Sequence, residues 1–239
     1  MRFLFVYLAA TLLESCESAS RARSRQGKLM GVAAFGGGPP APRVHDWARS
    51  VGKRDAPVVV EAFLDLMCPF SVKFYKTMRK DVLPKFGDDM KLVVYNYVQT
   101  WHWTSAVMAK ASIAAGQLAP SRYFDAFDVL ADLREKYTEQ EMTETTYSQI
   151  VEELGTALSS EPASIPKEDF IQLMDPRNDL HSNLLTEVKF HTKYGRQNSI
   201  HITPTVLING LVDNSISSSM SAEDWSRRLE FYKAQKIPS

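Results

Sequence analysis

The sequence contains very little cysteine and no excess of charge of either sign. Only two of its 239 residues are cysteine, and 28 lysines and arginines balance 28 aspartates and glutamates. Nucleic-acid-binding domains normally carry a basic excess or stripe, so we expect no nucleic-acid partner. The hydrophobic share of 44% and the charged share of 23% are instead typical of a soluble globular protein.

Several motifs of well-known chemistries are also missing. There is no Gly-x-Gly-x-x-Gly fingerprint, no Walker loop and no Gly-x-Ser-x-Gly elbow. The five histidines and two cysteines lack the spacing of a metal site, so we predict no metal and no bound cofactor. No apolar run after the N-terminus is long enough to cross a bilayer, so we expect no membrane span in the mature protein. Nothing in the sequence indicates an oligomeric state.

The N-terminus carries the one sustained apolar run. Arg2 precedes apolar residues from Phe3 to Leu13, and a small polar stretch follows up to Ser20. This run is too short to span a bilayer but suits the core of a signal peptide. We therefore predict a signal peptide at residues 1–20 and a place in the secretory pathway, either the endoplasmic reticulum lumen or outside the cell. A mitochondrial presequence and an ordinary N-terminal core helix are the alternatives.

Removal of that peptide would take Cys16 away and leave Cys68 as the one mature cysteine. A single cysteine in an oxidising compartment indicates a reactive thiol or an intermolecular partner, whereas the alternative is an inert buried residue. Residues 21–56, with the run Gly36-Gly37-Gly38-Pro39-Pro40, are predicted to form a flexible linker.

Regular structure is predicted from Pro57 onward. Residues 58–64 are β-branched and apolar, which is typical of a strand buried on both faces. Pro69 suits the first position of a helix, and the apolar spacing after it predicts a helix that Pro84 ends. A second strand at residues 91–98 would complete a strand–helix–strand unit.

The rest of the chain divides into a helical block and a final hairpin. From Trp101 to about Asn198 the apolar spacing is helical throughout, with Gly195 as the expected C-cap of the last helix. Residues 205–208 and 211–212 flank Asn209-Gly210, a strong hairpin signal. Ser221 to Asp224 is similar to a capping box and predicts a final helix.

Two of these segments resemble the DsbA-like thioredoxin-fold family. The stretch from Val58 to Phe74, containing Asp65-Leu66-Met67-Cys68-Pro69-Phe70-Ser71, looks like the active-site strand and helix of that family. The stretch from Ile200 to Gly210 looks like its cis-proline loop and hairpin, and the helical block stands where the family carries a helical insertion. The resemblance implies an α/β thioredoxin-like fold formed by residues 57–98 and 199–239, with residues 99–198 as an inserted helical subdomain.

The resemblance also implies a site. It places the Cys68 thiol at a helix N-terminus, where unpaired N–H groups and the positive end of the helix favour a thiolate. It further implies that Pro204 is cis and faces Cys68, so that the Thr203 backbone can bind an extended peptide. Cys68 and Ser71 are the candidate catalytic residues. The candidate substrate-binding residues are Pro69, Phe70, His102, Thr203 and Pro204.

Some residues depart from the pattern of the family. Ser71 replaces its usual second cysteine, so the Cys-x-x-Ser site cannot close an internal disulfide, although it can form mixed disulfides. The family's buried acid is not secure, because Ala62 lies six residues before Cys68 and Glu61 points to the opposite strand face. Asp65 is nearer to Cys68, but it can simply end the strand. His102 and His201 are either groups beside the thiol or ordinary surface histidines.

Three functions are consistent with these residues. The first is a monothiol thiol–disulfide oxidoreductase that forms mixed disulfides through Cys68 with cysteine-containing polypeptides or with glutathione as a co-substrate. The second is a catalytically degenerate thioredoxin fold that binds client peptides like a chaperone. The third is a DsbA-like glutathione-dependent transferase or isomerase.

Overall fold

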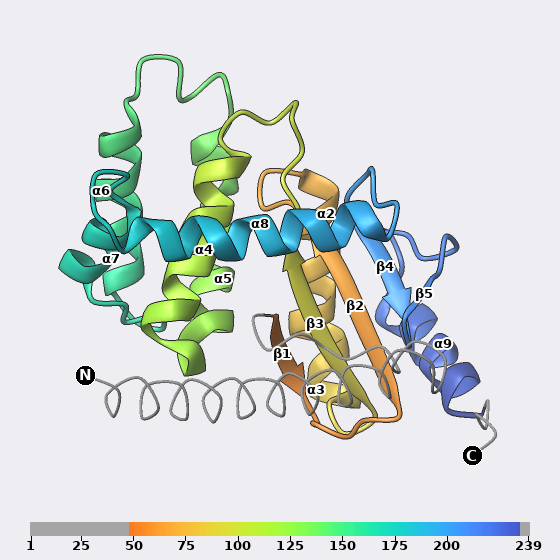
Figure 1. Cartoon of the computed structure of the whole chain (residues 1–239). Coiled ribbons are helices and arrows are strands. Elements are labelled where there is room, and N and C mark those ends of the chain that lie inside the picture. The colour runs from red at the N-terminus through yellow and green to blue at the C-terminus, as the bar shows by residue number, and fades with distance from the viewer. Residues whose placement is uncertain (1–47, 235–239) are drawn as a thin grey trace, which may run out of the picture. The chain divides into compact units, whose positions relative to one another are not determined.

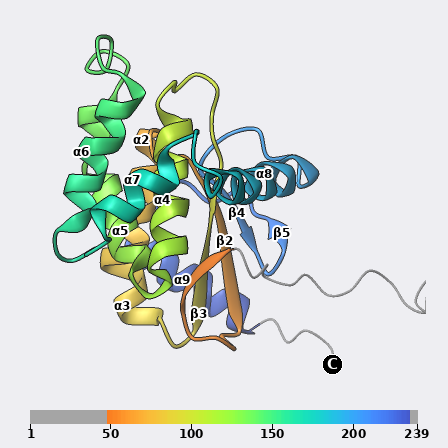
Figure 2. The same cartoon turned by 60° about the vertical axis from the view of Figure 1, so that its left-hand side comes forward.

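The computed structural model describes residues 48–234, and Figures 1 and 2 show how their helices surround one sheet. The predicted signal peptide and residues 21–47 of the predicted linker lie outside the described residues. Within residues 48–234, no helix combines the length and the apolar character that crossing a membrane requires.

The sheet has five strands in the order β1-β3-β2-β4-β5. β2 (Val58–Leu64) lies at its centre and pairs parallel with β3 (Met90–Asn96) and antiparallel with β4 (Thr205–Ile208). The short strands β1 (Arg49–Gly52) and β5 (Leu211–Val212) pair antiparallel at the two edges. The sheet therefore brings the chain that follows β2 beside the chain that precedes β4, although these segments are far apart in the sequence.

One face of the sheet is covered by the helix that follows β2 and by the last helix of the chain. After β2 the chain forms α2 (Pro69–Thr77), a π-helical turn (Met78–Val82) and α3 (Leu83–Phe86), and α9 (Ala222–Ala234) packs beside them. Alternate residues of β2, from Val58 to Leu64, face this layer. Phe74 of α2 meets Trp225 of α9 edge to face, with ring centroids 5.9 Å apart. Burial of these apolar side chains holds α2 firmly against the strand that ends at the cysteine loop.

The opposite face of the sheet is covered by one long helix, α8 (His181–Gln197), which crosses the strands in Figure 1. Phe63 and Tyr95, on the odd-numbered face of β2 and β3, stack on each other, and Phe63 also stacks on Tyr194 of α8. Both faces of the central strands are thus buried, as the largely apolar and β-branched sequence of β2 predicts.

The segment between β3 and β4 is helical, as predicted. It contains α4 (Ser105–Leu118), α5 (Tyr123–Asp132), α6 (Tyr147–Ser159) and α7 (Lys167–Met174), followed by α8, with 3-10 turns at Pro120–Arg122 and Arg134–Tyr137. α4 lies at the centre of this block and contacts the other four helices. Its run of Ala, Ser and Gly side chains lets these helices approach it closely. The second half of α8 packs on the sheet, so α8 belongs to both layers and the predicted boundary at residue 198 falls at its end.

The predicted linker extends too far. Its residues 49–52 form β1, which pairs with β3 from Arg49 opposite Val94 to Gly52 opposite Lys91. The sequence Arg-Ser-Val-Gly has little apolar character, and pairing with a long neighbouring strand provides its order. Gly52 has a φ of +101°, and a Cβ there would lie 2.3 Å from the Met90 carbonyl oxygen, so this edge turn requires glycine.

Two predicted helix ends are also wrong, and each has a local cause. The helix after Cys68 continues past Pro84 to Phe86, because the π-helical turn restarts the helix and places Pro84 in its first turn, where a proline is tolerated. Gly195 lies inside α8 and is not its C-cap. A Cβ at Gly195 would lie 2.3 Å from the ring of Tyr97, so the glycine accommodates this tyrosine.

The C-terminal predictions are confirmed. Asn209 and Gly210 have φ values of 49° and 84°, as a two-residue turn with two left-handed residues requires. Asp224 N donates to Ser221 Oγ at 3.2 Å, and the Asp224 carboxylate accepts from Ser221 N, which is the reciprocal pattern of a capping box at the start of α9.

Candidate active site

The cysteine loop, residues 65–68, connects the end of β2 to the start of α2. Cys68 is the N-cap of α2, with φ −76° and ψ 118°, and Pro69 follows at the first helical position. The Cys68 N–H donates to the Asp65 carbonyl at 3.0 Å, which closes the loop into a tight turn. Cys68 is 6% exposed and is the one free cysteine among residues 48–234. The thiol at the start of α2 is therefore nearly buried, and it makes no capping hydrogen bond to the N–H groups of the helix's first turn.

The sulfur contacts the loop that precedes β4. Cys68 Sγ donates to the Thr203 carbonyl oxygen at 3.3 Å, and the Thr203–Pro204 peptide bond is cis. The pairing of β4 with β2 brings these residues together across 135 positions of sequence. The Thr203 Oγ1 atom is buried and has no hydrogen-bond partner. Three of the predicted site residues, Cys68, Thr203 and Pro204, thus lie at one place.

Ser71 faces into the protein. It is 1% exposed, and its hydroxyl accepts a hydrogen bond from Asp65 N at 3.3 Å. The hydroxyl therefore stabilises the cysteine loop from the buried side of α2. Pro69 and Phe70, the two residues between Cys68 and Ser71, are exposed, and Phe70 is 61% exposed.

Asp65 is the acid nearest to the cysteine, and the structure gives it a larger place than the end of a strand. Its carboxylate is buried and accepts from Met67 N at 2.9 Å, from Gln99 N at 2.8 Å, and from the Ser105 hydroxyl at 2.6 and 2.8 Å. Burial raises the pKa of Asp65, although these hydrogen bonds oppose the change. In the sequence, only the closeness of Asp65 to Cys68 indicates a role at the site. The sequence does not reveal the groups that donate to its carboxylate, because Gln99 and Ser105 come from distant segments.

Glu61 belongs to the other face of the sheet, as the alternation along β2 predicts. Its carboxylate accepts from the Tyr95 hydroxyl at 2.8 Å and from Tyr194 of α8 at 3.4 Å. Ala62 is buried under α2. Neither of these two strand positions therefore places a carboxylate on the side of the sheet that α2 covers.

His102 lies close to the cysteine loop and makes no hydrogen bond to the Cys68 sulfur. It is half-buried and lines a hollow of about 320 Å³ together with Met67, Trp101, Trp103 and Arg134. His201 is exposed, and its Nδ1 lies 2.9 Å from the Ser199 carbonyl oxygen. The structure thus places His102 at the edge of the site and turns His201 toward its own loop.

Arg134 is a site residue that the sequence did not indicate. It begins the 3-10 turn after α5, and its Nε donates to the Met67 carbonyl at 2.8 Å. Its guanidinium also pairs with Glu135. Arg134 lines a second hollow, of about 380 Å³, beside Pro69 and Lys73 of α2. No local pattern marks this residue, because only the packing of α5 against α2 brings it to the loop.

Four large apolar side chains surround the site and remain exposed. Trp101 and Trp103 precede α4 and are 58% and 48% exposed, whereas Ile202 precedes Thr203 and is 57% exposed. With Phe70 they form the apolar rim, as we name these four residues. Large exposed apolar groups that gather around a polar centre are typical of a surface that binds a partner.

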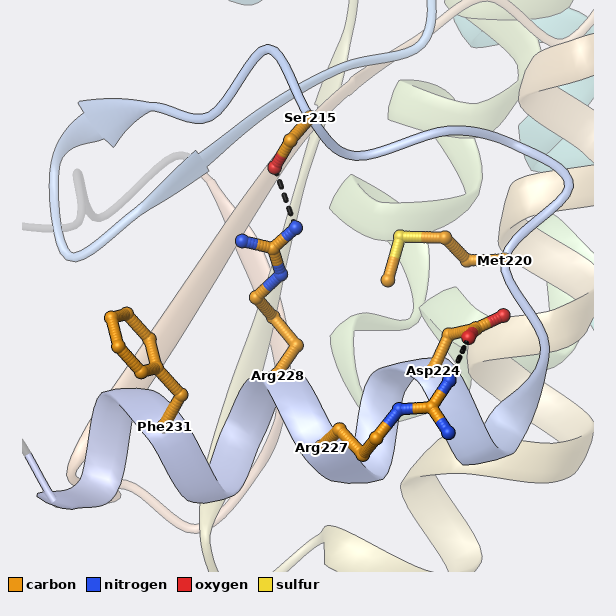
Figure 3. Close-up of a pocket in the computed structure, with 6 residues that line it drawn as sticks. All are labelled: Ser215, Met220, Asp224, Arg227, Arg228 and Phe231. Carbon is orange, nitrogen blue, oxygen red and sulfur yellow. Dashed lines mark hydrogen bonds and ion pairs between the residues drawn. The ribbon is translucent and has the colours of Figure 1, made fainter.

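A larger hollow of about 450 Å³ lies elsewhere, between α9 and the loop before it (Figure 3). Its charged groups are satisfied locally, because Arg227 pairs with Asp224 and Arg228 donates to Ser215. None of the predicted site residues lines it. Among residues 48–234 there is also no group of three or more His, Cys, Asp or Glu residues that could hold a metal ion.

Comparisons with known proteins identify the family and the fold. Residues 46–230 match the family described as thioredoxin. A candidate protein-disulfide isomerase from Pseudomonas syringae has 29% identity and a TM-score of 0.62, with 75% of this chain and 96% of that chain covered. BdbD from Bacillus subtilis, in its oxidised form, has 22% identity and a TM-score of 0.61, covering 78% of this chain and 93% of that chain.

A third solved structure has the same fold. The thiol-disulfide exchange protein alpha-DsbA2 from Wolbachia pipientis has 14% identity and a TM-score of 0.59, and the match covers 77% of this chain and 86% of that chain. No curated protein sequence matches the chain.

Proposed function

The chain belongs to the thioredoxin family, and from this premise we propose that it exchanges disulfides with cysteine-containing polypeptides through the single thiol of Cys68. The observation that carries this proposal is the contact of Cys68 Sγ with the Thr203 carbonyl, 3.3 Å away, at the start of α2. The sulfur and the backbone segment that leads into β4 meet there. The similarity to a candidate protein-disulfide isomerase supports the same chemistry.

The contact between Cys68 and Thr203 can act as a switch for client binding. The neutral thiol occupies the Thr203 carbonyl as a donor. Loss of the thiol proton, which attack on a disulfide requires, removes that donor. The Thr203 carbonyl is then free to accept from the backbone N–H of an extended client. The thiolate and the client's binding partner thus become available together.

The exchange proceeds through one mixed disulfide. The Cys68 thiolate attacks one sulfur of a client disulfide, the client S–S bond breaks, and the other client sulfur leaves as a thiolate. Ser71 has no thiol with which to resolve this adduct. An external thiol such as glutathione, or another cysteine of the client, attacks the client sulfur and releases Cys68 as a thiolate. When a client cysteine makes this attack, the number of disulfides does not change and no oxidant is consumed. A protein with a single thiol can therefore catalyse disulfide rearrangement.

The apolar rim supports a polypeptide client. Trp101 and Trp103 stand on one side of Cys68, on the segment before α4, whereas Ile202 stands on the segment before β4. A chain bound along Thr203 would meet both sides. We expect clients with large apolar residues next to the cysteine, because such residues would cover this surface.

The proposed exchange requires a compartment in which client disulfides persist. An oxidising compartment would supply the client disulfides, and the apolar run from Phe3 to Leu13 supports passage there. We propose that the protein acts outside the cytosol after loss of residues 1–20. This is tested by determining the N-terminal residue of the protein recovered from cells and the fraction in which it is found.

Trapping of the adduct tests the central proposal. The Cys16→Ser chain is incubated with oxidised glutathione, and with a peptide that carries a disulfide flanked by apolar residues, and adducts are located by mass spectrometry. We expect both adducts on Cys68 and none on the chain that also carries Cys68→Ser. If no adduct forms while the peptide still binds, the protein is a peptide-binding module. If the Cys68→Ser chain rearranges disulfides, the thiol mechanism is wrong.

A further inference from the structure

Asp65 and Arg134 hold the residue that precedes the cysteine from its two ends. The Asp65 carboxylate accepts from Met67 N at 2.9 Å, and Arg134 Nε donates to the Met67 carbonyl at 2.8 Å. Both peptide groups next to Met67 are therefore fixed by a charged side chain. Hydrogen bonds to charged groups are about twice as strong as those between neutral groups. The position of Cys68 is thus set by one buried carboxylate and by one arginine that lines the hollow of Trp101 and Trp103.

The same carboxylate reaches the loop that faces the sulfur. Its second oxygen accepts from Gln99 N at 2.8 Å, and Gln99 Nε2 lies 3.5 Å from the His201 carbonyl oxygen, two residues before Thr203. The Ser105 hydroxyl joins the carboxylate to the first turn of α4. One buried side chain therefore connects the cysteine loop, the segment after β3, and the loop of Pro204.

We propose that Asp65 and Arg134 are positioning residues that hold Cys68 against the Thr203 backbone for in-line attack on a client disulfide. The inference rests on the proposed function and adds two residues to it. Exchange needs the attacking sulfur aligned with the S–S bond of a bound client, and misplacement by about 1 Å can cost on the order of a hundredfold in rate. Alkylation of the thiol by a small reagent does not require a bound client or this alignment.

The acceptor pattern of Asp65 provides a sharp variant. One carboxylate oxygen faces Met67 N–H and the other faces Gln99 N–H. An asparagine amide has one acceptor oxygen and one NH₂ group, so Asp65→Asn turns a donor toward one of these N–H groups in either orientation. The side chain keeps its size while the loop loses one of its anchors. Arg134→Met likewise removes the donor to Met67, and Arg134→Lys keeps an N–H donor.

The test compares two rate constants on the full Cys16→Ser chain: mixed-disulfide formation at Cys68 with oxidised glutathione and alkylation with iodoacetamide. Asp65→Asn and Arg134→Met should each lower the first by about tenfold, without lowering the second. Arg134→Lys should recover part of the lost rate. Glu187→Gln is the matched control, because this buried carboxylate of α8 lies far from the cysteine loop in the network of Arg49 and Gln117.

Each outcome is decisive. Thermal unfolding establishes that each variant is folded at the temperature of the rate measurement, and if Asp65→Asn is not, Arg134→Met carries the comparison. The positioning role is wrong if both rate constants fall together, so that the ratio of mixed-disulfide formation to alkylation is the same in the variants as in the parent chain. If the parent chain forms no adduct with oxidised glutathione or with the peptide disulfide, the proposed function fails instead.

Discussion

Ser71→Cys is the change that should alter the chemistry of the site most directly. Residues 68 and 71 lie one turn apart at the start of α2, and Ser71 is 1% exposed behind the thiol. Positions three apart on a helix have Cβ atoms about 5–6 Å apart, and a disulfide requires roughly 3.5–4.5 Å. A small movement of the N-cap residue therefore closes the gap. The variant should pass a disulfide to a dithiol peptide and be regenerated by oxidised glutathione.

The reduced variant should lose a little stability. The Ser71 hydroxyl accepts one long hydrogen bond, from Asp65 N at 3.3 Å, and sulfur is a weak acceptor. Loss of such a bond costs about 1 kcal/mol in the free energy of unfolding. For a chain of this size that corresponds to a decrease in Tm of roughly 2–4 °C. Differential scanning calorimetry of the reduced protein measures this directly.

The activity is followed with a reduced peptide that contains two cysteines, in the Cys16→Ser chain, by alkylation and mass spectrometry. Ser112→Cys is the matched control, since Ser112 is equally buried but lies in α4 and binds the Tyr123 hydroxyl. We expect turnover with Ser71→Cys and only background oxidation with the parent chain and the control. Equal oxidation by the parent chain, or none above the control by the variant, would refute the reasoning.

Three further predictions concern stability and client binding. Burial lowers the pKa of His191, so this histidine takes up a proton on unfolding below about pH 6.5, and the free energy of unfolding falls as the pH decreases. In denaturant titrations at several pH values, His191→Gln should make this decrease smaller. Gly195→Ala should lower the free energy of unfolding by about 1–3 kcal/mol, because its Cβ would lie 2.3 Å from the Tyr97 ring; an unchanged denaturation midpoint would contradict this. Trp101→Ala with Trp103→Ala should slow adduct formation with an apolar-flanked peptide disulfide and leave the rate of alkylation by iodoacetamide unchanged. The unfolding midpoint should also stay unchanged, because both side chains are about half exposed.

The parts of the fold that the sequence predicts are those with local causes. The buried strand at Val58–Leu64 follows from a segment that is apolar except for Glu61, and the turn at Asn209-Gly210 follows from two residues that tolerate positive φ. Cys68 at a helix start follows from the proline after it. Each of these signals is contained in a few consecutive residues, so no tertiary information is needed to interpret it.

The features that were missed depend on contacts between distant segments. β1 is ordered by pairing with β3, and its own four residues carry no strand pattern. The roles of Asp65 and Arg134 depend on Gln99 N, Ser105 and the Met67 carbonyl, which only the folded chain brings within hydrogen-bonding distance. Periodicity and spacing describe which face of an element is buried, and they contain no information about such partners.

The continuity of α8 has a mechanical consequence. This helix runs unbroken over 17 residues, or about 25 Å, and it contacts α4 and α7 at one end of its course and β3 at the other. A single unbroken helix that packs in both layers connects them directly. Because the same helix packs on α7 and on β3, its two halves have fixed positions relative to each other. The ring of Tyr97 lies against Gly195 of α8, and its hydroxyl donates to the Ile200 carbonyl at 2.6 Å, so the end of this helix is tied to the segment that leads to Pro204.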